Sequence, residues 1–288
     1  MMSKPDFTFA IRRILVALDA SPQSLAALDA AVNLAAKLDA EILGLFVEDA
    51  ALLGLSEIPY AREVLYFSSA EAPVTRASME SRLKAQSEQA RKSLEAAAER
   101  AQITWSFRTA RGRVTSEVLA ASAGVDLLAL GKGGWSLGSR IRIGSTAMGI
   151  VESSLPVFLL PERGVPENAH LLVYYDSSPA AQRGLLAAAM LARAGMDGIA
   201  VLVESRNKVD VKQVEKEIDA LLDGGDIQIR YLPFDASNEE NLLRLLKGEK
   251  NGVLVLGGRE LLDKLPSLDT LLRETELPLM ILGSAPTS

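Results

Sequence analysis

The chain has 288 residues, 48% of them hydrophobic, and a formal net charge of −6. This length suits two domains with substantial cores, and the acidic balance argues against nucleic acid as a partner. Because there is no cysteine and His170 is the only histidine, disulfides, thiolate chemistry and multi-histidine metal sites are excluded.

The N-terminal sequence does not have the pattern of a secretory signal. Its apolar run is short, follows Arg12 and Arg13, and is interrupted by Asp19. No stretch reaches the ~18 uninterrupted apolar residues of a membrane span. We therefore expect a soluble, cytoplasmic protein that does not have a membrane as its partner.

The first half of the chain alternates between strand and helix patterns. The nearly continuous apolar run 11–18 predicts a buried parallel strand, and Ser21-Pro22 predicts the start of a helix that continues to residue 38. Further strands are expected over 40–47, 103–109, 125–130 and 155–160, and further helices over 77–101, 115–122 and 145–153. This alternation predicts a doubly wound parallel sheet.

Residues 48–74 interrupt the alternation. Their prolines and apolar side chains predict short helical turns, packed on the other domain, on a partner chain or over a ligand.

The pattern restarts after a polar linker at 162–169. Asp176-Ser177-Ser178-Pro179 repeats the Asp-x-Ser-Pro of residues 19–22, and Leu277-Pro278 repeats Leu155-Pro156. Strands are expected over 170–175, 199–203, 227–232, 253–256 and 277–282, and helices over 209–222 and 238–247. We predict an α/β protein of two tandem, doubly wound, five-stranded parallel sheets, with domains at residues 1–163 and 164–288.

A glycine-rich stretch follows the strand expected over 125–130. Gly131, Gly134 and Gly144 allow main-chain N–H groups to approach an anion, and Ser145 lies near the start of a helix. Lys132, Arg140 and Arg142 add positive charge nearby. The stretch is neither GxxxxGK[ST] nor GxGxxG, and a glycine-rich turn without a ligand remains the alternative.

The spacing Gly131-x2-Gly134-x9-Gly144-Ser145 resembles the ATP-binding signature of the universal stress protein family. The resemblance is strong over residues 10–161 and weak over 169–283, as in the tandem two-domain type. It implies a Rossmann-like, adenine nucleotide α-hydrolase-like fold that binds ATP, with or without Mg²⁺, in the N-terminal domain. It also implies a role in stress response or regulation.

The resemblance assigns contacts to particular residues. Asp19 would lie on the adenine and ribose side of ATP, the Val47 main chain would contact adenine, and Ala17 would line the base pocket. The phosphate positions correspond to Gly131, Gly134, Gly144 and Ser145, with Lys132 as a candidate cation. The alternatives are a capping role for Asp19, a core role for Val47 and a solvated surface charge for Lys132.

The second copy differs where the phosphates would lie. Counted from the matching Leu-Pro, Gly144-Ser145 become Pro266-Ser267, and the loop is four residues shorter. Because Pro266 has no N–H to offer, we expect this degenerate domain to be a structural or regulatory partner that does not bind nucleotide by the same route.

No catalytic base, arginine finger or carboxylate pair is marked out by spacing, so efficient phosphoryl transfer is not expected. An ATP-binding module is the favoured interpretation, and the alternatives are a slow ATPase switch and an interaction protein without nucleotide. The family often pairs through its fifth strands, which here would be residues 157–160 and 279–282. This predicts a pseudo-dimer within the chain and leaves further homodimerisation open.

Overall fold

The computed structural model describes residues 10–55, 62–64, 71–73, 75–132, 150–151, 155–204, 208–222, 227–234 and 239–283. The strands are β1 (Arg13–Leu18), β2 (Glu41–Asp49), β3 (Arg62–Val64), β4 (Glu71–Pro73), β5 (Trp105–Gly112), β6 (Leu127–Gly131), β7 (Val157–Leu160), β8 (His170–Tyr175), β9 (Ile199–Glu204), β10 (Ile229–Phe234), β11 (Gly252–Leu256) and β12 (Leu279–Ile281). The helices are α1 (Pro22–Leu38), α2 (Ala50–Leu55), α3 (Arg76–Ala101), α4 (Val114–Ala121), α6 (Pro179–Arg193), α7 (Lys208–Leu222), α8 (Glu239–Gly248) and α9 (Leu268–Glu274), with a 3-10 helix, η1 (Arg259–Lys264).

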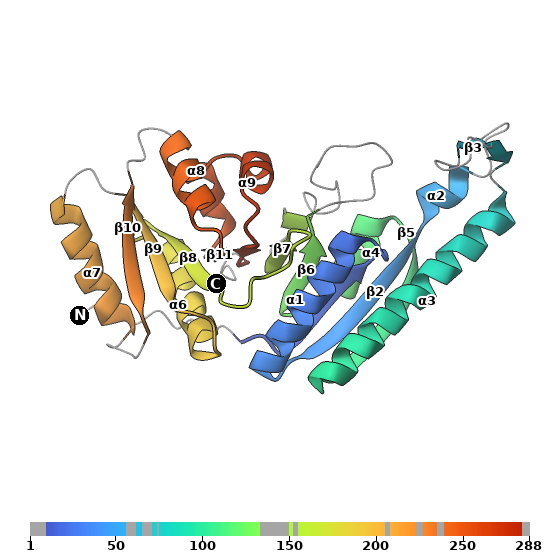
Figure 1. The fold of residues 1–288 in the computed structure, drawn as a ribbon, viewed down its shortest axis with the longest axis horizontal. Coiled ribbons are helices and arrows are strands. Elements are labelled where there is room, and N and C mark those ends of the chain that lie inside the picture. The colour runs from blue at the N-terminus through green and yellow to red at the C-terminus, as the bar shows by residue number, and fades with distance from the viewer. Residues whose placement is uncertain are drawn as a thin grey trace.

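Ten strands form one continuous sheet in the order β10-β9-β8-β11-β12-β7-β6-β1-β2-β5 (Figure 1). All neighbours are parallel except β12 and β7, which run antiparallel with Phe158 opposite Met280. The sheet therefore consists of an N-terminal half (β1, β2, β5, β6, β7) and a C-terminal half (β8 to β12), related by a pseudo-two-fold axis. This confirms the predicted pair of doubly wound sheets and their contact through the fifth strands.

Apolar side chains pack on both faces of the sheet. Ile14 and Val16 of β1 join the core beneath α1, α3, α6 and α7, whereas Leu15 joins the core beneath α4, α8 and α9. Helices on both sides explain why the strands read as nearly continuous apolar runs.

The first helix of each half, α1 or α6, begins with a serine N-cap. The Ser21 hydroxyl accepts a hydrogen bond from the Ser24 N–H (3.2 Å), and the Ser178 hydroxyl accepts one from the Ala181 N–H (3.2 Å). A proline at the first helical position follows each serine, as the sequence predicts.

The interruption after β2 differs from the expectation. It contains the short helix α2, as predicted, but also the antiparallel pair β3–β4, which was not expected because three-residue strands leave no alternating pattern to detect. Figure 1 shows α2 and β3 at the end of the molecule remote from the C-terminal half. In the described part this segment therefore does not pack on the other half.

Candidate functional site

The carboxyl ends of β1 and β6 form a topological switch point. The chain leaves β1 through α1 on one face of the sheet and enters β6 after α4 on the other face. Because β1 lies between β2 and β6, the segments after Leu18 and Gly131 begin side by side. Open α/β sheets bind their ligands at such places.

Asp19 is the first residue beyond β1. Its Oδ1 accepts a hydrogen bond from the Ser21 N–H (2.9 Å), and its own N–H donates to the Ser24 hydroxyl (3.3 Å). Asp19 thus stabilises the turn before α1, whereas the capping role suggested as its alternative is filled by Ser21. Oδ2 has no partner within the described part of the chain and remains available to a ligand.

Ala17 and Val47 lie on the same face of the sheet, where both pack at the margin of the α4 core and are only partly buried. The Glu41 N–H donates to Arg12 on the β1 side, and the Ile42 N–H donates to Thr104 on the β5 side. Because strand residues alternate with a period of two, the polar groups of Val47 point toward β1. The last β1–β2 pair is Leu18 with Phe46, so the Val47 carbonyl lies at the point where β1 has ended.

Gly131 ends β6 directly against the first turn of α1. A Cβ atom added at Gly131 would lie 2.8 Å from the main-chain carbonyl carbon and oxygen of Gln23. The structure thus gives this glycine a packing requirement in addition to any contact with an anion.

The Lys132 side chain, which follows Gly131, is directed at the C-terminal half. Its ammonium group donates to the main-chain carbonyls of Thr275 (3.3 Å) and Leu277, both in the C-terminal half, and the residue is 6% exposed. Burial and the positive charge of Arg163 lower the pKa of Lys132 to about 7 against a smaller opposing effect of Glu276. This arrangement does not match either sequence-based expectation, because the side chain is neither directed at a phosphate nor solvated.

The remaining predicted site residues lie outside the described residues. These are Gly134, Gly144 and Ser145, together with the nearby Arg140 and Arg142. Of the helix expected over 145–153, the structure describes the buried helical residues Ile150 and Val151.

The same place in the C-terminal half is filled by protein side chains. Tyr174 stands 157 positions after Ala17, is 2% exposed and packs its ring against Phe234 at a centroid distance of 6.1 Å. Asp176, the counterpart of Asp19, is paired with the Lys264 ammonium group through Oδ2.

The pKa values of the two residues reflect this filling. Burial raises the pKa of Tyr174 to about 12, helped by the carboxylates of Glu204 and Asp176. Burial also acts to raise the pKa of Asp176, but hydrogen bonds from Lys264 and Ser178 outweigh it and hold that pKa below its ordinary value.

Sequence reasoning missed Tyr174, Phe234 and Lys264. The offset of 157 positions between the two Asp-x-Ser-Pro segments carries the signal for Tyr174. No comparable signal marks Lys264, because it belongs to η1 within the shortened loop, where the two copies cannot be aligned by position.

Across the described ranges, no group of three or more His, Asp or Glu side chains is placed to hold a metal ion. Among the helices of these ranges, none combines the length and apolar character needed to cross a bilayer.

These features define a tandem α/β protein with a switch point in each half. Residues 10–161, more than half of the chain, match the family model described as Universal stress protein family, and the chain belongs to that family. No curated protein sequence matches it.

A universal stress protein from each of two organisms is similar to this chain over both halves. A universal stress protein from Archaeoglobus fulgidus is 18% identical, with a TM-score of 0.66 over 95% of this chain and 98% of that chain. A putative universal stress protein from Pseudomonas aeruginosa is 14% identical, with a TM-score of 0.53 over 95% of this chain and 93% of that chain. At these identities the likeness shows a shared fold.

Proposed function

We propose that the protein is an ATP-binding module of stress response or regulation, with ATP held by the N-terminal domain at residues 1–163. The contrast between the two switch points carries the proposal. In one half Ala17 is small and Oδ2 of Asp19 is an acceptor without a partner among the described residues, whereas Tyr174 and Lys264 occupy the corresponding places in the other.

The described residues fit the base and ribose end of a nucleotide. The Asp19 carboxylate is suited to accept hydrogen bonds from ribose hydroxyls. The Val47 carbonyl, directed past the end of β1, is suited to accept from an amino group on the base. Gly131, Gly134, Gly144 and Ser145 would hold the phosphates, and Lys132 is left out of this set because its ammonium group is bound elsewhere.

Calorimetry with ATP on purified protein stripped of bound ligand tests the proposal. Asp19→Asn keeps an acceptor for the Ser21 N–H but removes the charge, and Asp176→Asn is the matched control in the other half. We expect Asp19→Asn to weaken ATP binding by about 10- to 100-fold, as for a lost hydrogen bond to a charged group, and the control to bind as wild type. A wild-type protein that gives no binding heat would refute the proposal.

Transfer of the tyrosine tests the base pocket separately. Ala17→Tyr copies the C-terminal half into the N-terminal half and should abolish ATP binding, whereas Ala17→Ser, which stays small, should leave the affinity within about twofold. Equal affinities of the two variants for ATP would show that Ala17 does not line the base pocket.

Phosphate release distinguishes the binding module from the slow ATPase switch. Our proposal predicts no protein-dependent release of phosphate from ATP. Release that disappears in Gly144→Pro, which removes a main-chain N–H donor, would favour the switch. Adenine nucleotide that co-purifies from cells, identified by mass after denaturation, would argue against an interaction protein without nucleotide.

A further inference from the structure

Lys132 links the two halves of the molecule at the point where the predicted phosphate loop begins. Its main-chain N–H donates to the Leu160 carbonyl on β7 (2.7 Å), so its backbone belongs to the N-terminal half. Its ammonium group donates to Thr275 and Leu277 in the C-terminal half. With only 6% of the residue exposed, little water competes for these bonds.

The carbonyls that Lys132 contacts lie just beyond a helix. Thr275 is the C-cap of α9, and its N–H donates to the Leu271 carbonyl (3.0 Å). The C-terminal end of a helix carries unpaired carbonyls and partial negative charge, which a lysine is suited to satisfy. Ser267 at the start of α9 is the residue that aligns with Ser145. Lys132 therefore caps the helix that corresponds, in the other half, to the one expected after the glycine loop.

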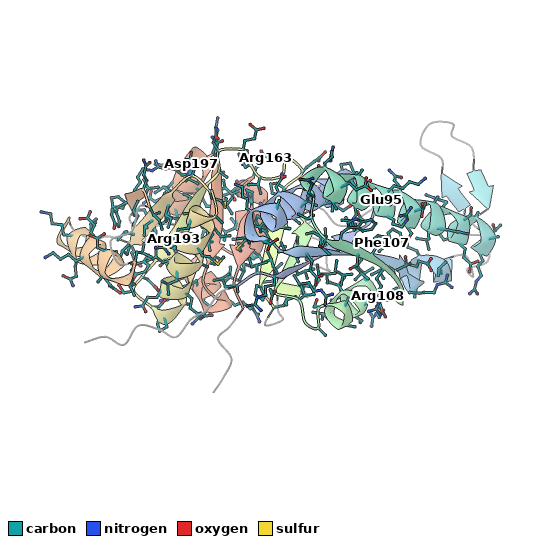
Figure 2. All side chains as sticks on the ribbon, turned by 90° about the horizontal axis from the view of Figure 1, so that it is seen from below. Glu95, Phe107, Arg108, Arg163, Arg193 and Asp197 are labelled. Carbon is teal, nitrogen blue, oxygen red and sulfur yellow. The ribbon has the colours of Figure 1, made fainter. Side chains whose placement is uncertain are left out.

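Arg163 reinforces the same contact. Its Nε donates to the Glu276 carbonyl (3.0 Å), and its guanidinium also donates to the Lys250 carbonyl (3.1 Å). Figure 2 shows Arg163 where the two halves meet. Three consecutive carbonyls, those of residues 275–277, are thus held by two cations from the N-terminal half.

The C-terminal half has no lysine at the position equivalent to Lys132. Counted from the equivalent glycines Gly131 and Gly257, the counterpart of Lys132 is Gly258, which has no side chain to reach across. At these two equivalent positions, the C-terminal half therefore contacts Lys132, at the start of the predicted phosphate loop, and Gly258 makes no such contact in return.

We propose that Lys132 is a positioning residue through which the C-terminal half sets the nucleotide affinity of the N-terminal half. The proposal rests on the proposed function. The segment 275–277 fixes Lys132 and, through it, Gly131, the point from which the predicted phosphate loop departs. Because coupling between two events is reciprocal, bound nucleotide must stabilise the Lys132 contact by the same factor.

A pair of lysine variants tests the effect on affinity. Lys132→Met removes the amine and retains an apolar stem suited to burial. The control is Lys37→Met, since Lys37 also donates across the halves, to the Gly195 carbonyl (2.8 Å), but is exposed and remote from the switch point. In calorimetry with ATP, we expect Lys132→Met to weaken binding by about fivefold or more and Lys37→Met to leave it unchanged. Equal affinities of the two folded variants would overturn the proposal.

Acetylation of the wild-type chain tests the reciprocal effect and requires no variant to fold. With acetic anhydride at pH 8, ATP should slow the acetylation of Lys132 by about fivefold or more without affecting that of Lys37. Bound ATP with unchanged acetylation of Lys132 would overturn the coupling alone. A wild-type protein that binds no ATP would overturn the proposed function, and the coupling with it.

Discussion

At the scale of single residues, Gly131 leaves no room for a side chain against the main chain of α1. Gly131→Ala would place a Cβ atom 2.8 Å from the main-chain carbonyl of Gln23, so that β6 and α1 must separate. Overpacking of this kind costs about 1–3 kcal/mol, and we expect a lower free energy of unfolding by that amount in urea denaturation.

The control for this variant is Gly54→Ala. Gly54 lies in α2 and has open space where a Cβ would be, and alanine is the better helix former, so stability should stay equal or rise slightly. Equal stabilities of Gly131→Ala and the wild type would contradict the tight contact between β6 and α1.

Lys132 predicts a pH dependence of stability. Burial lowers its pKa from 10.5 to about 7 in the folded chain, where Arg163 and Glu276 are the charged groups that face it. Between these two values the unfolded chain binds more protons than the folded one, so the free energy of unfolding should rise with pH over this window. The slope reaches about 1.4 kcal/mol per pH unit.

Urea denaturation from pH 7 to 9.5, on wild type and Lys132→Met, measures this contribution. The difference in unfolding free energy between the two proteins should change with pH in favour of the wild type, because other titrating groups are common to both. If the unfolding free energies of the two proteins changed with pH in parallel, the buried Lys132 amine would have to stay protonated throughout.

At the scale of elements, the matched caps of α1 and α6 give a paired prediction. Ser21→Ala and Ser178→Ala each remove one hydrogen bond to a helical N–H, at 3.2 Å in both cases. Each should lower stability by about 1 kcal/mol, and the double variant should lose the sum because the two sites are independent. Thermal and urea unfolding of the three variants check both the size and the additivity.

The elements also show what sequence can and cannot predict. Buried parallel strands such as β1 and β8 were predictable because both faces are covered, which produces long apolar runs. Strand ends were less accurate: β2 continues to Asp49, two residues past the predicted end. The short helix α9 was missed, since seven residues give too little periodicity.

The candidate site was predictable in part, for a related reason. The position of Asp19 and Gly131 at the switch point was predictable, because the carboxyl ends of neighbouring parallel strands lie at the same edge of a sheet. The partners of Lys132 were not found, because they lie 143 and 145 residues away and are main-chain carbonyls, which no side-chain pattern marks.

At the scale of the whole molecule, the antiparallel contact between β7 and β12 turns two half-sheets into one. Phe158 and Met280 face each other across this contact and are almost fully buried. Lys132, Arg163 and Lys37 add hydrogen bonds that cross between the halves. β7 and β12 cannot separate without exposing their main-chain N–H and C=O groups to water, so the two halves should be energetically coupled.

This coupling predicts a single unfolding transition for the chain. Both tryptophans, Trp105 and Trp135, belong to the N-terminal half of the sequence, so their fluorescence reports on that half alone, whereas far-ultraviolet circular dichroism reports on both. In urea, the two signals should change with the same midpoint and the same slope, as in a two-state transition. Phe158→Asp would place an unpaired charge in the buried contact, and we expect it to separate the two signals, with different midpoints for the two halves. Two distinct midpoints in the wild-type protein would show that the halves fold independently and that the continuous sheet does not join them energetically.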